Sequence, residues 1–375
     1  MHKVNEVEIL YSAAHGQFPD TEPLGGGKTV ADHLEREHPD WVMLTPRSLQ
    51  LSLERPLTEM TVRQYARFCR QFERATTEAI LQRRPAGCVV LSNDICEGPD
   101  FRRLGGLGYR IATIFHVDAV EYFTKFYLRG WIRPERLACF RWDRRWVPDV
   151  LRLVFAKQED CVRFSRRIIV PSEPMREVIV RCYPWCPAKK IVVIPWGNIA
   201  PPVPAEPLDI PEDEFVIVTL SRLSPEKGIE RLLRALRYVR IPRLRVFICG
   251  AAAYMRGRAY ERRLRRLASG LPVTFTGHVT GARKSALLRR ADLFVSPSQH
   301  ESYGLTIAEA LAHGCRVISH AHYGARGKVV NCADPRALAE EIEATALVRT
   351  PRHVFSEPPV AAWQVATVLA ELAEK

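Results

Sequence analysis

The feature of this sequence that most restricts its fold is a regular alternation of short apolar runs with helix-length segments. Each run in the first half is apolar nearly throughout, which is typical of strands buried on both faces of a parallel sheet. The pattern therefore predicts a doubly wound α/β domain. The expected strands are residues 7–13, 41–45, 88–92, 110–115, 168–171 and 191–195.

A segment rich in proline and acidic residues, 198–215, interrupts the alternation and has no apolar periodicity. It is expected to be a linker. Beyond it, strands are expected at 215–220, 244–249, 273–276, 293–296 and 316–319, with helices at 228–239, 260–268, 284–290, 304–313, 335–347 and 360–374. The chain is thus predicted to be α/β, with two Rossmann-like doubly wound domains facing each other across a cleft. We expect these domains at 1–200 and 201–358, with a C-terminal helix, 359–375, that packs back on the first.

The composition restricts the partners and the cellular location. A net charge of +13, from 55 Lys and Arg against 42 Asp and Glu, favours an anionic partner such as nucleic acid, anionic lipid or nucleotide phosphates, or else reflects a basic surface without a specific patch. No apolar run is long enough to span a bilayer, and the first residues lack the regions of a signal peptide. We expect a cytoplasmic protein, with a peripheral position on the inner face of the membrane as a further option. The ten cysteines lack zinc-site spacing and are expected to be reduced structural thiols.

The segment ADLFVSPSQHESYGLTIAEALAHGCRVIS, 291–319, carries the strongest chemical signal. A predicted strand leads into a polar loop containing Glu301, and a helix is expected to begin near Gly304. The free amides of Gly304, Leu305 and Thr306 would offer a phosphate site at the positive end of the helix dipole. Glu309 could accept hydrogen bonds from ribose hydroxyls, and Glu301 would stand near a sugar. Alternatively, Glu301 only caps the helix and Glu309 is a solvated charge.

A second segment, LSRLSPEKGIERLL at 220–233, places two cations after a predicted strand. Arg222 ends the strand, and Lys227 precedes the helix that Gly228 opens. Cations at the carboxyl end of a strand can neutralise a diphosphate leaving group. The alternative is that both are ordinary surface cations of a strand-to-helix loop.

Together the two segments resemble the donor-binding half of the retaining glycosyltransferase family 4, the glycosyl transferases group 1 of GT-B fold. The family signatures are S-R-L-x-x-x-K-G and E-S-[FY]-G-L-x-x-x-E-A-x-A-x-G. Here they are matched by Ser221, Arg222, Leu223, Lys227 and Gly228, and by Glu301, Ser302, Tyr303, Gly304, Leu305, Glu309, Ala310 and Gly314.

The resemblance implies a role for each matched residue. Arg222 and Lys227 would hold the diphosphate, and the amides of residues 304–306 would hold the distal phosphate. Glu309 would bind the ribose and Glu301 the transferred sugar, and Tyr303 is also expected to be a donor-binding residue. Base contacts in the family come from loops that correspond here to His278 and Val279.

The N-terminal half matches the family less closely. The family's glycine-rich loop corresponds to EPLGGGKTV, in which Gly26 and Gly27 would let the backbone approach a phosphate or sugar. The family histidine at a strand end corresponds to His116, while the aspartate that usually follows it falls one residue late, at Asp118. His15 and Asp94 also follow predicted strands, but we interpret both as structural.

One loop departs from the family pattern. The family places a G-[GI]-x-x-E loop and a longer insertion after the strand that here is expected at 316–319. This chain keeps Gly324 and the pair Asp334 and Pro335 but lacks the glutamate and part of the insertion. The resemblance therefore does not extend to the identity of the donor sugar.

The resemblance implies a retaining, metal-independent glycosyltransferase that moves a hexose-type sugar from a nucleoside diphosphate sugar to an acceptor hydroxyl. The acceptor could be a glycan, a lipid-linked molecule or a small molecule. No cofactor besides the donor is expected, and no Asp-x-Asp metal motif occurs. Glu301, His116, Arg222 and Lys227 are the expected catalytic residues, with Glu301 positioning the sugar while a phosphate oxygen takes the acceptor proton. A double displacement stays open as a mechanism, as do an inactive nucleotide-sugar-binding protein and, less favoured, a nucleic-acid-binding protein.

Residues 121–167 mix Phe, Tyr and Trp with many Arg. Such a segment can lie on an anionic membrane surface. It could equally cover an acceptor cleft or pack inside the N-terminal domain.

Overall fold

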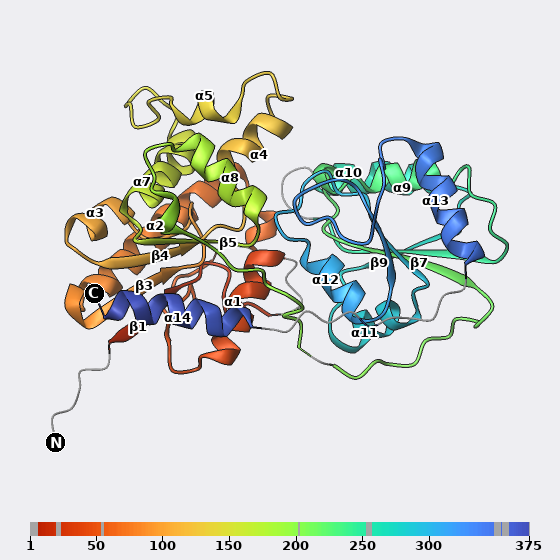
Figure 1. The fold of residues 1–375 in the computed structure, drawn as a ribbon, viewed down its shortest axis with the longest axis horizontal. Coiled ribbons are helices and arrows are strands. Elements are labelled where there is room, and N and C mark those ends of the chain that lie inside the picture. The colour runs from red at the N-terminus through yellow and green to blue at the C-terminus, as the bar shows by residue number, and fades with distance from the viewer. Residues whose placement is uncertain are drawn as a thin grey trace. The chain divides into compact units, whose positions relative to one another are not determined.

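A computed structural model of the chain describes residues 7–19, 24–53, 56–201, 203–252, 257–348, 354 and 360–374. The chain divides into two compact units (Figure 1). Unit 1 comprises Met1–Phe18, Gly26–Trp196 and Val360–Lys375, and unit 2 comprises Pro19–Gly25 and Gly197–Pro359. Pro19–Gly25, which the sequence placed in the N-terminal domain, thus groups with unit 2.

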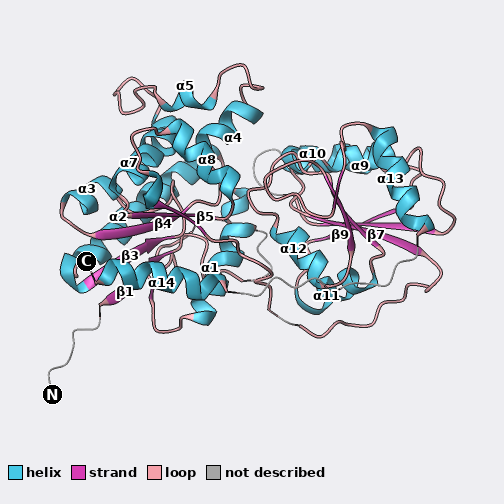
Figure 2. Cartoon of the chain, in the orientation of Figure 1, coloured by secondary structure: helices cyan, strands magenta, loops and turns pink. Residues whose placement is uncertain are grey.

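Unit 1 is built on a six-stranded parallel sheet of order β2-β1-β3-β4-β5-β6, with helices around it (Figure 2). The strand order changes direction between β1 and β3, the position at which open α/β sheets commonly bind ligands. The strands are β1 (Glu8–Ser12), β2 (Val42–Leu44), β3 (Cys88–Ser92), β4 (Arg110–Ile114), β5 (Arg167–Val170) and β6 (Ile191–Val193). The helices are α1 (Gly26–Glu37), α2 (Val62–Leu81), α3 (Phe101–Gly106), α4 (Ala119–Phe126), α5 (Pro134–Ala138), α6 (Asp149–Leu151), α7 (Lys157–Phe164), α8 (Glu173–Cys182) and α14 (Ala361–Ala373).

The last helix, α14, packs on unit 1. The ring Nε2 of His38 lies 3.1 Å from the carbonyl oxygen of Ala362 at its start. At its end, Arg110 donates to the carbonyl oxygen of Ala373 over 2.7 Å. Buried Val365 and Leu369 lie on the apolar face of the helix. The two ends of the expected range, 359 and 375, lie outside the described residues.

Unit 2 contains a second six-stranded parallel sheet, of order β12-β11-β10-β7-β8-β9. Its order reverses between β7 and β10, the position at which open α/β sheets commonly bind ligands. The strands are β7 (Phe215–Leu220), β8 (Leu244–Cys249), β9 (Val273–Gly277), β10 (Leu293–Ser296), β11 (Arg316–Ser319) and β12 (Lys328–Val329). The helices are α9 (Ile229–Ala235), α10 (Gly257–Leu267), α11 (Gly281–Arg290), α12 (Leu305–Ala312) and α13 (Pro335–Leu347), and a 3-10 turn, η5 (Pro225–Lys227), precedes α9.

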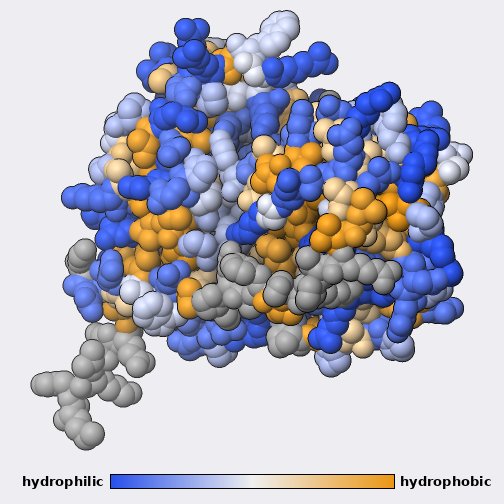
Figure 3. All heavy atoms as spheres, turned by 45° about the vertical axis from the view of Figure 1, so that its right-hand side comes forward, coloured by the Kyte–Doolittle hydropathy of each residue, from blue (hydrophilic) through white to orange (hydrophobic). Residues whose placement is uncertain are grey.

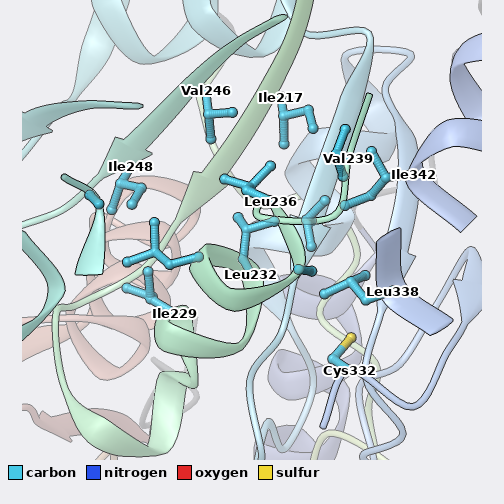
Figure 4. Packing of buried hydrophobic residues seen from close by; sticks show 14 of the residues in the cluster. Ile217, Ile229, Leu232, Leu236, Val239, Val246, Ile248, Cys332, Leu338 and Ile342 are labelled. Carbon is cyan, nitrogen blue, oxygen red and sulfur yellow. The ribbon is translucent and has the colours of Figure 1, made fainter. Parts of the chain in front are cut away.

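Successive residues of β7 face opposite sides of the sheet, and both sides are buried. Ile217 belongs to a cluster with Leu232 and Leu236, which lie in and just after α9 (Figure 4). Val216 and Val218 belong to a second cluster on the other face. This is why the strand reads as a continuous apolar run instead of an alternating one.

These sheets confirm the α/β prediction of two doubly wound Rossmann-like units. Some details differ: the helix expected at 228–239 is described as α9 only to Ala235, α10 and α11 begin three residues before the expected starts at 260 and 284, and β12 was not expected. Among the described residues, no helix is both long and apolar enough to cross a membrane.

Candidate functional site

In unit 2 the two motif segments meet at the point where the strand order reverses. The η5 turn after β7 packs on the loop after β10, and the amide of Gln299 donates to the carbonyl oxygen of Glu226 over 2.8 Å. Gly228 has φ +61°, and a Cβ there would lie 2.5 Å from the carbonyl oxygen of Pro297. Only glycine allows this approach, so the K-G pair of the sequence motif is needed for the contact.

The contact brings a cation onto a carboxylate. Lys227 Nζ lies 2.7 Å from Glu301 Oε1, across 74 residues of sequence, and the two side chains are 13% and 18% exposed. Burial acts to raise the pKa of Glu301, but the charge and hydrogen bond of Lys227 outweigh it and hold that pKa below its ordinary value. The carboxylate is therefore ionised at neutral pH.

Arg222 follows β7, in the same loop as Lys227. Its Nη2 lies 3.8 Å from Glu226 Oε1, and Glu226 is held in turn by the hydroxyl of Ser224 over 2.6 Å. The guanidinium is 29% exposed, so it keeps access to solvent while its position is fixed. A guanidinium in this position can form charge-assisted hydrogen bonds with an anion.

The amino end of α12 forms the third part of the site. Gly304 has φ +76° and precedes the helix, whose first residues are Leu305 and Thr306. A Cβ at Gly304 would lie 2.9 Å from the carbonyl oxygen of Gly324, and the Gly324 amide donates to the carbonyl oxygen of Glu301 over 3.0 Å. The amides of a first helical turn have no partner within the helix and carry the positive end of its dipole. This end can bind a phosphate.

Tyr303 forms hydrogen bonds and ring contacts within unit 2. Its hydroxyl oxygen accepts a hydrogen bond from the amide of Gly197 over 2.7 Å. The guanidinium of Arg326 lies 4.1 Å from its ring centroid and donates to its carbonyl oxygen over 2.7 Å. The aromatic position of the motif therefore orients the turn before α12, and its buried side chain packs within the protein.

Glu309, in α12, also pairs with a lysine. Lys284 Nζ, from α11, lies 2.7 Å from Glu309 Oε1, and the carboxylate is 9% exposed. This partner was not expected from the sequence. His278 follows β9, and Val279 packs against the apolar cluster that contains Val216.

In unit 1 a second group of polar residues meets where the strand order changes. His116, after β4, has its Nε2 3.2 Å from Asn93 Oδ1, and Asn93 donates to the carbonyl oxygen of Gly27 over 3.2 Å. A Cβ on Gly27 would lie 3.5 Å from Asp94 Oδ1 and 3.8 Å from the His116 ring. Gly26 begins α1 beside it. Burial lowers the pKa of His116, which favours its neutral ring.

His15 and Asp94, which we interpreted as structural, belong to the same group. Asp94 accepts the amide of Ala14 over 3.0 Å and faces His15 Nδ1 at 3.1 Å. His15 Nε2 lies 3.4 Å from the hydroxyl of Tyr65, which donates to Glu97. Burial acts to raise the pKa of Asp94, but His15 and His116 hold it below its ordinary value.

Asp118, the displaced aspartate, is a helix cap. Its carboxylate accepts the amide of Glu121 over 2.8 Å at the start of α4, and Gln158 donates to it over 2.8 Å. Burial raises the pKa of Asp118 to about 6. Asp118 therefore has a structural role at the start of α4.

Sequence reasoning missed Asn93, Lys284 and Arg326. Asn93 directly follows an expected strand, as His116 does, and this position was a usable signal. The pairing of Lys284 or Arg326 depends on packing between elements that the sequence does not show. Within the described residues, no group of three or more His, Cys, Asp or Glu side chains could hold a metal.

Fold and site together define a protein of two Rossmann-like units in which cations, carboxylates and a helix amino end meet at a strand crossover. Residues 205–362 match the family model described as Glycosyl transferases group 1, which confirms the resemblance seen in the C-terminal half.

Relatives and solved structures agree with this match. The sulfoquinovosyl transferase SQD2 of Arabidopsis thaliana is 31% identical over 113 residues, which cover 27% of this chain and 21% of that protein. The D-inositol 3-phosphate glycosyltransferase of Salinispora tropica is 33% identical over 155 residues, covering 36% of this chain and 32% of the relative. Each match thus spans less than half of the relative's length. Anabaena HepE, solved in complex with UDP-glucose, is 16% identical with a TM-score of 0.64 and covers 98% of each chain, which shows a shared fold.

Proposed function

We propose that this protein is a retaining, metal-independent glycosyltransferase that moves a hexose-type sugar from a nucleoside diphosphate sugar to an acceptor hydroxyl. The observation that carries the proposal is the 2.7 Å contact between Lys227 and Glu301. It unites a cation suited to a diphosphate with a carboxylate suited to sugar hydroxyls. The relatives named as glycosyltransferases and the fold shared with a UDP-glucose complex support the same reading.

The proposed site meets the charge of the leaving group with protein groups alone. Arg222 and Lys227 stand beside the diphosphate, and the amides of residues 304–306 receive its distal phosphate. Such preorganised cations and dipoles are worth most where negative charge develops as the glycosidic bond breaks. Glu309, oriented by Lys284, binds the ribose hydroxyls, and His278 lies near the base.

Retention follows if the acceptor attacks the face that the diphosphate leaves. The acceptor oxygen forms the new bond to the anomeric carbon, the bond to the phosphate oxygen breaks, and that phosphate oxygen takes the acceptor proton. Glu301 then holds the sugar by its hydroxyls and forms no covalent bond. Donor binding must also draw Lys227 from Glu301 toward the phosphate, which leaves the carboxylate ready to accept sugar hydroxyls.

The test is incubation of the full chain with UDP-, GDP- and ADP-sugars, with and without EDTA, followed by measurement of nucleoside diphosphate release. We expect one donor class to be turned over, EDTA to have no effect, and Lys227→Met and Glu301→Gln each to lose activity. Glu214→Gln is a matched control, because Glu214 pairs with Arg245 at the opposite end of the sheet over 2.8 Å and should keep full turnover.

Binding of a sugar nucleotide without any release would instead favour a non-catalytic sensor. Full turnover in the Lys227 or Glu301 variant would contradict the assigned roles. An inverted product, identified by NMR of the anomeric proton, would contradict the retaining mechanism.

A further inference from the structure

The segment 125–148, which links α4 to α6 in unit 1, sorts its side chains into two sets. Leu137, Trp142 and Val147 are buried, and the indole of Trp142 donates to the carbonyl oxygen of Leu137 over 2.8 Å. The Trp142 ring also lies 4.3 Å from that of Phe155. The contact with Phe155 anchors the segment on the rest of unit 1. The segment includes α5 and lies at the outer edge of this unit (Figure 1).

The second set points outward. It contains five large apolar side chains that are exposed: Tyr127 at 55%, Trp131 at 90%, Ile132 at 40%, Phe140 at 41% and Trp146 at 71%. Large rings are rarely left in water over a short stretch unless a partner covers them. In Figure 3 the top of the view, where α5 lies, mixes hydrophilic with pale and hydrophobic side chains.

Cations are interleaved with these rings. The segment holds seven basic residues against two acidic ones, Glu135 and Asp143, for a net charge of +5. All seven basic side chains are exposed, and they are Lys125, Arg129, Arg133, Arg136, Arg141, Arg144 and Arg145. Of these, Arg141 already pairs with Asp143 over 3.1 Å.

We propose that segment 125–148 docks unit 1 on the surface of an anionic lipid bilayer. Indole and phenol rings favour the headgroup region, where an apolar body and a polar edge are both satisfied. The arginines add attraction to anionic headgroups. A nucleic acid fits less well, because Ile132 has no aromatic face on which a base could stack.

This inference rests on the proposed function and adds the acceptor class to it. A glycosyltransferase bound to a bilayer surface would use an acceptor hydroxyl carried by a lipid. Of the three readings of this segment, packing inside unit 1 holds for buried Trp142, and the proposal assigns the exposed rings and cations to a bilayer.

The test is co-sedimentation of the full chain with vesicles of phosphatidylcholine and phosphatidylglycerol, against vesicles of phosphatidylcholine alone. We expect binding to the anionic vesicles that weakens as salt rises. The double variant Trp131→Ala and Trp146→Ala should bind about tenfold less at constant salt, because each ring buries apolar surface at the interface. A blue shift of tryptophan fluorescence on vesicle addition should disappear with it.

Two matched controls test whether vesicle binding depends on this segment, or on any exposed tryptophan or any exposed arginine pair. Trp363, on α14, is 69% exposed, and Trp363→Ala should bind vesicles as the unaltered protein does. Arg262 and Arg266 on α10 are exposed, and their joint change to Ser should also leave binding intact. Equal loss in either control would overturn the proposal.

Two further outcomes would overturn it: no preference for anionic vesicles, or a single-stranded RNA that displaces the vesicles and depends on the same two tryptophans. Unfolding curves of the Trp131 and Trp146 variant should match those of the unaltered protein, which excludes misfolding as the cause. Release of nucleoside diphosphate without vesicles should stay unchanged in this variant. Loss of vesicle binding with intact release thus separates failure of docking from failure of the proposed function.

Discussion

Replacing Lys227 by Met and Glu301 by Gln, singly and together, measures how strongly the two motif segments are coupled. At 2.7 Å and an effective dielectric constant near 20, the Coulomb attraction has an upper limit of about 6 kcal/mol. Desolvation of both groups offsets most of it, so the net coupling should be about 2 kcal/mol, as for other hydrogen bonds between charged groups. Each single change should cost about 2 kcal/mol or more, and the double change clearly less than the sum.

The assay must report on unit 2 alone. All tryptophans lie in the ranges that form unit 1, so fluorescence would miss the effect. Hydrogen-exchange mass spectrometry at increasing urea concentrations can follow peptides of α9 and α12 in the full chain. The same cycle with Arg245→Met and Glu214→Gln is the control, and its coupling should stay below about 1 kcal/mol because Arg245 is 37% exposed. A Lys227–Glu301 coupling no larger than that of the control pair would refute the reasoning.

The coupling should also depend on pH in a defined direction. Because the folded pKa of Glu301 lies below its ordinary value, its contribution is fully present above the pKa of an unfolded glutamate, about 4.3. It is lost as pH falls through the lower folded pKa. The difference in unfolding free energy between the unaltered protein and Glu301→Gln should therefore be smaller below about pH 4 than at pH 7.

Three other changes have calculable effects. Gly304→Ala places a Cβ at φ +76°, 2.9 Å from the carbonyl oxygen of Gly324. The unfolding free energy of unit 2 should fall by about 1–2 kcal/mol in the same exchange assay, and the affinity for phosphate should fall with it. Asp94→Asn removes the charge that accepts from Ala14 and faces His15 and should cost about 2 kcal/mol in urea unfolding followed by tryptophan fluorescence. Since the pKa of Asp94 is lowered, that cost should fade below about pH 4, and a constant cost would contradict the assignment. Thr61→Ala breaks the capping box at the start of α2 and should cost about 1 kcal/mol, with unchanged sugar transfer.

Strands were the most predictable part of the fold, and the reason is visible in β7. Its two faces are covered by separate apolar clusters. Because both faces are buried, nearly every residue of the strand is apolar, and the sequence shows a continuous apolar run. Phe215–Leu220 and Leu293–Ser296 were accordingly predicted to the residue. The edge strand Lys328–Val329 is short and exposed, and no apolar run marked it.

The site was predictable in its parts but not in its pairings. The family resemblance implied that Lys227 and Glu301 belong to one site, and in the structure both follow strands that adjoin at the crossover. It did not indicate that the two would neutralise each other, or that Lys284 would pair with Glu309. Ion pairs between elements depend on how each helix is rotated against the sheet, and this rotation cannot be read from a single sequence.

The loop after β11, which departs from the family pattern, supports the turn before α12 through Gly324 and Arg326. The sequence there lacks the family glutamate, and Arg326 uses its guanidinium on the ring and carbonyl oxygen of Tyr303. Gly324 lies so close that a Cβ would meet the Tyr303 carbonyl oxygen at 2.3 Å. Both contacts hold the turn that presents Gly304 at the start of α12. A cation thus supports the turn from within unit 2, and the carboxylates near this turn are Glu301 in the loop before α12 and Glu309 in α12.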